Sequence, residues 1–267
     1  MHKNPRNKLS RRSFLASSLR AALFGTYALN SNARTQTPWS NWSGGLSCNP
    51  KGRYDIAAEN QLIDLLRETS GPIRPVGSGH SFSPLVPTDG HLIVIDQLSG
   101  VFDHDSQSLQ ATVGAGTRLG DLGAPLFEVG QGMLNLPDID RQTVAGATAT
   151  GTHGTGIDFK SLSGYITGLR IITASGEVKD IDASHGDLFD AARVNLGALG
   201  IVTQIRMQNR KSFKLKKREW TAPTEELLQN FETLAERHRQ FEIFPLVYSD
   251  YSCLLYTSPS PRDRQKS

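Results

Sequence analysis

The sequence predicts an α+β fold, and two observations lead to that expectation. Helical and strand patterns follow one another irregularly from residue 55 to residue 207, without the repeating strand–helix–strand rhythm of a doubly wound parallel sheet. The 267 residues are 37% hydrophobic with a mean hydropathy of −0.35, which is typical of a globular chain. Arg20 interrupts the one candidate apolar stretch, residues 14–29, so a stable membrane span is not expected.

The first predicted element is an amphipathic helix after Asp55, which can act as its N-cap, and the helix is expected to end near Ser70–Gly71. A short strand at residues 73–76 leads into a glycine loop, and residues 92–95 read as a continuous apolar strand. The later elements are a strand pair (100–113, turn at 103–108), a helix (118–129), a hairpin (169–173 and 177–181), a short helix (187–194) and a strand (201–207). A shift to basic, amphipathic sequence predicts a domain boundary between residues 208 and 220.

Charge is distributed unevenly along the chain. Residues 1–33 carry six cations and no acid, and residues 253–267 carry a net charge of +2, so a formal net charge of +3 leaves −5 for residues 34–252. A nucleic-acid or other polyanion partner is therefore not expected, because the excess positive charge lies in two ends that we do not assign to the fold.

The N-terminal segment 1–33 resembles a twin-arginine export signal. Arg11 and Arg12 precede a weakly apolar stretch, and small residues at Ser31 and Ala33 suit a signal peptidase. The alternative is a basic tail. On the export interpretation, the twin-arginine machinery recognises the segment, the mature chain begins near Arg34, and the protein is periplasmic or otherwise exported.

The C-terminal segment 253–267 begins with Cys-Leu-Leu-Tyr-Thr-Ser-Pro-Ser-Pro-Arg-Asp, which is similar over eleven residues to one reading frame of a widely used sequencing adapter. The alternative is a Pro/Ser-rich tail. On the adapter interpretation, Cys48 is the single native cysteine, either paired with a later cysteine or buried, and we favour burial. Residues 214–252 then open a truncated domain whose apolar side chains are expected to lack a core: Phe231, Phe241, Ile243, Phe244, Leu246 and Val247.

Two glycine loops carry the functional signal. In Arg74–Ser81 (Arg-Pro-Val-Gly-Ser-Gly-His-Ser), glycines allow successive backbone amides to converge on an anion such as a pyrophosphate. A tight surface turn would explain this loop alone equally well. The second loop, residues 146–156, adds four glycines, threonine hydroxyls and His153 in eleven residues, a composition too polar for a core strand.

Competing motifs fail on their spacing. Gly114-Ala115-Gly116 is followed by Gly120, one position late for the dinucleotide fingerprint, and Ile157 stands where the phosphate-binding loop 151–156 would require lysine. The seven histidines are scattered, so no metal is expected, and there is no Gly-x-Ser-x-Gly elbow for a hydrolase.

Three stretches together resemble the PCMH-type FAD-binding domain of the vanillyl-alcohol-oxidase family: residues 74–81, residues 142–156 and Asn-Leu-Gly-Ala-Leu-Gly-Ile-Val-Thr at 195–203. Trp-Ser-Asn-Trp-Ser-Gly at 39–44 is similar to the opening of its aldonolactone and alditol oxidase branch, the branch of D-arabinono-1,4-lactone oxidase and L-gulonolactone oxidase. The resemblance covers residues 38–213. It implies an FAD-binding domain of two α+β subdomains at 34–213, followed at 214–252 by the start of an α+β substrate domain.

The resemblance also implies how FAD is held. His80 would be joined covalently to the flavin 8α-methyl, and the absence of Cys from residues 138–156 implies a single attachment. Residues 76–81 would hold the pyrophosphate, residues 146–153 the ribityl and isoalloxazine, and residues 200–202 the adenosine. Thr148, Thr150 and Thr152 could instead only satisfy buried backbone groups. The cofactor-binding residues implied are Arg74, Val76, Gly77, Ser78, Gly79, His80, Ser81, Gly146, Ala147, Thr150, Gly151, Thr152, His153, Gly200, Ile201 and Val202.

The implied activity is an exported FAD-linked oxidoreductase that transfers a hydride from a CH–OH carbon of a sugar lactone or polyol to flavin N5. Oxygen or a quinone or cytochrome acceptor would reoxidise the flavin. The base is expected in the substrate domain, so no catalytic residue is assigned and the sequence given is expected to be inactive by itself. The alternatives are an acceptor-linked dehydrogenase of the same fold and a non-enzymatic exported binding protein that kept the fold. Intact Gly77, Gly79 and His80 argue against the binding protein.

Overall fold

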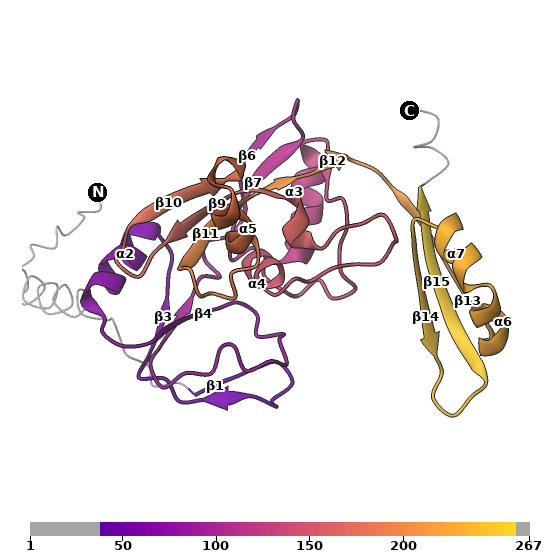
Figure 1. The fold of residues 1–267 in the computed structure, drawn as a ribbon, viewed down its shortest axis with the longest axis horizontal. Coiled ribbons are helices and arrows are strands. Elements are labelled where there is room, and N and C mark those ends of the chain that lie inside the picture. Colours follow the sequence, from indigo (N-terminus) through magenta and orange to yellow (C-terminus); the bar gives the residue numbers. More distant parts are fainter. Residues whose placement is uncertain (1–37, 260–267) are drawn as a thin grey trace, which may run out of the picture. The chain divides into compact units, whose positions relative to one another are not determined.

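The computed structural model describes residues 38–259 (Figure 1). The twin-arginine segment 1–33 and the last eight residues, 260–267, lie outside the described residues, so the export prediction stays a prediction. Within residues 38–259, no helix combines the length and the apolar character that crossing a bilayer demands. The mixture of helices and strands confirms the α+β class.

A small parallel sheet carries the first glycine loop. Its strands are β3 (Gly52–Asp55), β5 (His91–Val94) and β4 (Ile73–Val76), in the order β3-β5-β4, and helix α2 (Glu59–Glu68) connects β3 to β4. The predicted strand at 73–76 is confirmed. The prediction that Asp55 caps the helix is wrong: Asp55 ends β3 opposite Val94, and the residue before α2 is Ala58. Pairing continues at Ile56, whose N–H donates to the Val94 carbonyl at 2.8 Å, and this delays the helix.

A five-stranded antiparallel sheet forms the second subdomain, in the order β10-β9-β11-β7-β6. The strands are β6 (Val101–Asp105), β7 (Gln110–Gly114), β9 (Ile166–Ile172), β10 (Val178–Asp182) and β11 (Ile201–Gln208). The predicted strand pair at 100–113, the hairpin at 169–181 and the strand at 201–207 are confirmed. The turn between β6 and β7 is shorter than predicted, because pairing reaches from Asp105 to Gln110.

Three helices pack beside this sheet. A 3₁₀ turn, Leu119–Leu122, runs into α3 (Gly123–Glu128), and α5 spans Asp187–Arg193, both near the predicted positions. Helix α4 (Val144–Ala149) was not predicted, since its Gly, Thr and Ala composition has little periodicity. It forms because the Thr143 side chain accepts a hydrogen bond from the Gly146 N–H at 3.3 Å and because Val144 and Ala147 are buried.

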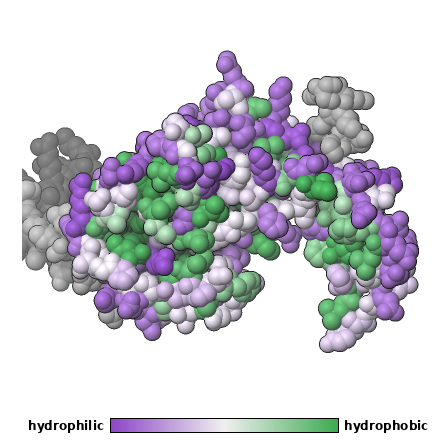
Figure 2. Space-filling view, viewed as in Figure 1, coloured by the Kyte–Doolittle hydropathy of each residue, from purple (hydrophilic) through white to green (hydrophobic). Residues whose placement is uncertain are grey.

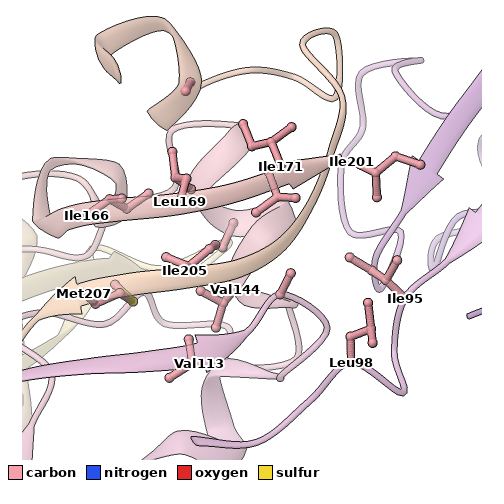
Figure 3. Packing of buried hydrophobic residues seen from close by; sticks show 14 of the residues in the cluster. Ile95, Leu98, Val113, Val144, Ile166, Leu169, Ile171, Ile201, Ile205 and Met207 are labelled. Carbon is pink, nitrogen blue, oxygen red and sulfur yellow. The ribbon is translucent and has the colours of Figure 1, made fainter. Parts of the chain in front are cut away.

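One hydrophobic core joins these elements. Figure 3 shows Val144 of α4 beside Ile205 of β11 and Val113 of β7, with Ile95 and Leu98 entering from the chain after β5. The core therefore links the parallel sheet, the antiparallel sheet and α4, and it fixes the positions from which the glycine loops emerge.

The C-terminal region is a three-stranded antiparallel sheet, in the order β13-β15-β14, with helices α6 (Thr224–Gln229) and α7 (Phe231–Arg237). The strands are β13 (Leu215–Pro223), β14 (Gln240–Pro245) and β15 (Tyr251–Pro259). Strand β13 begins within the range 208–220, and the domain boundary expected there stays a prediction. The segment that resembles an adapter thus supplies most of the central strand, and its origin stays a prediction.

The expectation that the apolar side chains of this region lack a core is wrong in part. Phe241 and Ile243 pack against a small cluster of Ala222, Leu227 and Leu254. Leu254 closes that cluster from the central strand. The other residues named for this expectation are exposed: Phe231, Phe244, Leu246 and Val247.

Two short strand pairs complete the described chain. The first pair, β1 (Trp39–Ser40) with β2 (Ser47–Cys48), lies beside the first glycine loop, and Cys48 within it is a half-buried free thiol. The second pair is β8 (Gln131–Gly132) with β12 (Arg210–Lys211).

Candidate cofactor site

Three segments distant in sequence surround a cavity of about 520 Å³. They are residues 74–86 at the end of β4, residues 142–152 around α4, and residues 195–202 between α5 and β11, with Ile95 between them. Figure 2 shows apolar residues gathered on the face that carries α4, α5 and β4. The structure therefore brings together the three stretches that carried the sequence argument.

Backbone amides of the first loop are available to an anion. Carbonyl oxygens of Gly79, His80 and Ser81 accept hydrogen bonds from residues 41 and 42. The N–H of the next residue points the opposite way in a trans peptide unit, so the amides of His80, Ser81 and Phe82 are turned away from that segment. Within residues 38–259 these amides donate no hydrogen bond, and all three residues line the cavity. Successive free amides of this kind suit a phosphate.

Glycine allows the first two loops to meet. A Cβ at Gly77 would lie 2.2 Å from Oγ1 of Thr143, and the Ser78 hydroxyl donates to the Arg141 carbonyl at 2.6 Å. Gly79 has φ of +66°, a conformation that side chains rarely adopt. The loop from β4 therefore lies directly against the start of α4.

The threonines of the second loop have mainly backbone roles. Thr148 Oγ1 donates to the Val144 carbonyl at 2.8 Å, and Thr150 Oγ1 donates to the Gly146 carbonyl at 2.9 Å. Thr152 Oγ1 donates to Oε1 of Gln142 at 3.1 Å. Thr150 and Thr152 still line the cavity, so these bonds fix its wall rather than leave hydroxyls free.

The third segment closes the cavity with a tight turn. The Asn195 side chain accepts a hydrogen bond from the Gly197 N–H at 2.7 Å. Gly200 has φ of +138°, and a Cβ there would lie 2.6 Å from the Ile172 carbonyl oxygen. Only glycine lets the chain enter β11 this close to β9.

Most of the implied cofactor residues line the cavity: Arg74, Val76, Gly77, Ser78, Gly79, His80, Ser81, Gly146, Thr150, Thr152, Gly200 and Val202. Four do not. Ala147 and Ile201 are buried in the core, Gly151 turns the chain after α4 with φ of +70°, and His153 is exposed with Nδ1 2.9 Å from the Gly154 carbonyl.

Several lining residues were not assigned from the sequence. Gln142, Asn195 and Gly197 stood inside the quoted stretches, so the motif itself was the available signal. Four apolar lining residues also lie inside those stretches: Pro75, Ala145, Ala149 and Leu196. Four others lie outside them, and the sequence offered no signal of ligand contact there: Phe82, Leu85, Val86 and Ile95.

The charge of the lining suits an anionic ligand. Among the described residues that line the cavity, Arg74 is the charged one and there is no carboxylate. The described part of the chain also contains no group of three or more His, Cys, Asp or Glu arranged to hold a metal ion. A dinucleotide with a pyrophosphate and apolar rings fits this combination of free amides, one arginine and aliphatic wall.

The C-terminal region contacts residues 134 and 135 and the far end of the second loop. Arg239 donates to the Leu134 carbonyl at 2.7 Å, and Gln240 donates to the Asn135 side chain at 2.6 Å. Glu242 accepts from the Thr155 hydroxyl at 3.5 Å; burial raises the pKa of this carboxyl, and the charge of Asp138 adds to the effect. These contacts lie beyond the residues that line the cavity.

Comparison with known proteins defines the class. Residues 55–182 match the family model described as FAD binding domain, so the chain contains an FAD-binding domain. Both glycine loops and strands β4 and β5 of the parallel sheet fall inside the matched range.

Three individual proteins that are similar to this chain have more specific names than the family model. The chain is 38% identical over 215 residues to L-gulono-1,4-lactone dehydrogenase of Mycobacterium tuberculosis, covering 79% of this chain and 50% of the relative. It is 33% identical over 211 residues to D-arabinono-1,4-lactone oxidase of Kluyveromyces lactis (76% and 40% covered) and 29% identical over 222 residues to L-gulonolactone oxidase of Mus musculus (82% and 50%). The chain spans about half the length of these relatives or less.

The fold is also found among solved structures. A cholesterol oxidase from Brevibacterium sterolicum, solved as a point mutant, superposes with a TM-score of 0.75 at 19% identity, covering 84% of this chain and 48% of that one. At this identity the likeness concerns the fold, and it confirms the expected PCMH-type architecture.

Proposed function

We propose that FAD occupies the cavity between the three segments. The observation that carries this proposal is the cavity itself, because one space is lined by both glycine loops and by residues 195–202. The free amides of His80, Ser81 and Phe82 would bind the pyrophosphate, and Arg74 would add positive charge. Val76, Ile95 and Val202 supply apolar surface for the rings.

We propose further that His80 forms the covalent link to the cofactor. His80 is among the residues that line the cavity, which brings its imidazole within the neighbourhood of a cofactor bound there. Bond formation replaces an N–H bond of His80 and a C–H bond of the flavin 8α-methyl by one C–N bond. The reaction would release two protons and two electrons in total, and the electrons would pass to the acceptor that also serves turnover, dioxygen or a quinone or cytochrome.

The proposed activity is oxidation of a CH–OH group of a sugar lactone or polyol. Bound FAD supplies a hydride acceptor for this chemistry. This chain's residues would orient the cofactor, hold its phosphates and exclude water from the apolar wall, and the proton acceptor for the substrate hydroxyl would come from the region after residue 213. The names of the relatives support the substrate class, since the three described above are lactone dehydrogenases or oxidases.

We also propose export through the twin-arginine route, on the evidence of Arg11 and Arg12. That route carries folded protein, so FAD would be inserted before export. Replacing both arginines by lysine is expected to retain the protein in the cytoplasm, measured by fractionation of expressing cells. Unchanged periplasmic yield would contradict this part of the proposal.

The test of cofactor and activity uses two measurements on the purified protein. Absorbance and acid precipitation report bound and covalent flavin, and anaerobic mixing with L-gulono-1,4-lactone, D-arabinono-1,4-lactone or a polyol reports flavin reduction when the polypeptide includes its substrate domain. A colourless protein that takes up no FAD would contradict the proposal at its first step. FAD uptake without reduction by any of these substrates in such a complete polypeptide would contradict the proposed substrate class.

A further inference from the structure

Three successive carbonyl groups of the first loop bind to one short segment near the N-terminus. The Trp42 N–H donates to the Gly79 carbonyl at 3.1 Å, and the Trp42 indole Nε1 donates to the His80 carbonyl at 3.2 Å. The Asn41 side chain donates to the Ser81 carbonyl at 3.2 Å. Each bond fixes the orientation of one peptide plane of the loop. Because N–H and C=O point in opposite directions in a trans peptide unit, the amides of His80, Ser81 and Phe82 are turned away from residues 41 and 42.

Trp42 also holds the imidazole of His80 directly. The two rings are stacked, with centroids 5.3 Å apart and planes at 24°, and Phe82 meets the indole edge-on at 5.8 Å. An imidazole on a flexible loop samples several rotamers, and a stacked indole reduces that freedom. The stack on Trp42 therefore favours one orientation of the His80 ring.

Burial separates Trp42 from its neighbours in the same segment. Trp39 is 8% exposed and packs with Val76, Leu92 and Val94, so it belongs to a core cluster. Trp42 is 58% exposed, although its ring and its N–H both contact the loop of His80. An exposed indole contributes little to the hydrophobic core. We therefore assign the role of Trp42 to its contacts with the loop that carries His80.

Asn41 gives this arrangement a fixed base. Its side chain is 3% exposed, and Oδ1 accepts the Leu46 N–H at 3.0 Å, which assigns its amide nitrogen to the Ser81 carbonyl. The turn between β1 and β2 thus carries Asn41 and Trp42 on a hydrogen-bonded frame. We call these two residues the N-terminal clasp.

We propose that the N-terminal clasp positions the first loop for both of its tasks: it turns the amides of His80, Ser81 and Phe82 toward the cofactor pyrophosphate, and it holds the His80 imidazole for covalent attachment. Asn41 and Trp42 are positioning residues, since they act through the loop. This inference rests on the proposed binding of FAD in the cavity. The inference adds that two residues outside the cavity lining, Asn41 and Trp42, prepare the loop for binding and covalent attachment of FAD.

The test compares three variants of the 267-residue chain. Trp42→Leu removes the ring stack and the indole N–H, Trp42→Phe keeps a ring but loses the N–H, and Trp220→Leu is a matched control that removes a tryptophan from the C-terminal sheet. The apo-proteins are mixed with FAD, and acid-precipitable flavin is followed with time over a range of FAD concentrations. The rate of covalent attachment at saturating FAD reports how well the His80 imidazole is positioned. The FAD concentration that gives half of this rate reports how well the amides of His80, Ser81 and Phe82 bind the pyrophosphate. Circular dichroism checks that each variant is folded.

Trp42→Leu is expected to slow covalent attachment at saturating FAD by roughly tenfold and to raise the half-saturating concentration by roughly fivefold, since an aligned hydrogen bond and a ring contact are both lost. Trp42→Phe is expected to recover most of the rate but not the affinity. Trp220→Leu is expected to match wild type.

Other results would overturn the inference. Wild-type rate and affinity in folded Trp42→Leu would show that Trp42 positions neither the amides nor the His80 imidazole, and would overturn the inference. A wild type that binds FAD without covalent attachment would refute the His80 link and the second task, while a wild-type affinity in Trp42→Leu would still refute the first. A wild type that binds no FAD would refute the proposed function, and the inference with it.

Discussion

The two regions of this chain use the same kinds of element with very different cores. In residues 38–213, β9 and β11 are buried along most of their length, and one cluster extends through both sheets and α4. In residues 215–259, β13 is exposed at nearly every position and the buried cluster consists of Ala222, Leu227 and Leu254. Figure 2 shows apolar residues on the surface over β14 and β15.

This difference teaches where the function resides. The cavity is lined entirely by residues between 74 and 202, which the large core supports. The C-terminal region is joined to that half by contacts such as those of Arg239, Gln240 and Glu242 with residues 134–155. We expect the first region to bind cofactor whether or not the second is intact.

The largest expected effects on stability come from replacing a buried leucine by alanine in the core of each region. Leu122→Ala and Leu254→Ala both remove a fully buried leucine and are each expected to cost about 2–5 kcal/mol in unfolding free energy. Leu122→Ala should destabilise the first region and reduce FAD binding. Leu254→Ala should unfold the C-terminal sheet and leave FAD binding intact. Thermal denaturation followed by flavin fluorescence and by far-UV circular dichroism separates the two, and loss of FAD binding in Leu254→Ala would contradict the independence of the regions.

A second pair of variants tests the contact between the glycine loops. Gly77→Ala places a Cβ 2.2 Å from Thr143 Oγ1 and is expected to cost about 1–3 kcal/mol while weakening FAD binding at least roughly tenfold. Gly123→Ala, at a helical position with open space, is the control and should stabilise by about 0.5–1 kcal/mol. Chemical denaturation and FAD titration provide both values. Equal FAD affinity in the two variants would show that the loops are not packed as described.

Much of this arrangement could be read from the sequence, because local signals were strong where glycine or apolar runs left few alternatives. The strand at 73–76 and the glycine loop after it are examples. Helix α4 could not be read, since its Val144 and Ala147 are helical only through the cap of Thr143 and through burial in a tertiary core. Burial in that core could not be read for Ala147 and Ile201 either, which the resemblance assigns to the cofactor and which are buried in the structure.

The N-terminal clasp shows the other limit. Asn41 and Ser81 are forty positions apart, and no local pattern reports that their groups meet. The sequence marked residues 39–44 only by resemblance. Contacts of this kind depend on the fold as a whole and are visible only in three dimensions.

A smaller effect distinguishes the regions by pH. Burial, and secondarily the charge of Arg237, lowers the pKa of His238, which stacks on Tyr256 in the C-terminal sheet. A depressed folded pKa gives stability that is complete above the unfolded value of about 6.5 and is lost as pH falls through the folded value. The C-terminal transition should therefore shift to lower temperature between about pH 7 and pH 5. His238→Gln should remove that shift, and an unchanged pH profile in His238→Gln would contradict this assignment.

The smallest effect lies in the first region. A hydrogen bond from Arg170, 2.8 Å from Asp180, holds the pKa of that carboxyl below its usual range, so its contribution is present above about pH 4 and is lost as pH falls further. Since Asp180 is largely exposed, Asp180→Asn should cost only about 0.5 kcal/mol at pH 7. Asp64→Asn, on the exposed face of α2, is the control. Denaturant unfolding at pH 7 and pH 3 should show the difference between Asp180→Asn and wild type disappear at the lower pH; a constant difference would contradict the linkage.

The most direct test of the central claim, that the three segments hold FAD with His80 at its edge, is the intact mass of the 267-residue chain after incubation with FAD. Wild type is expected to gain the mass of one FAD that survives acid denaturation, and His80→Ala is expected to bind FAD by absorbance but to show no mass increment. A flavin increment that persists in His80→Ala, or a wild type that takes up no FAD at all, would contradict the account.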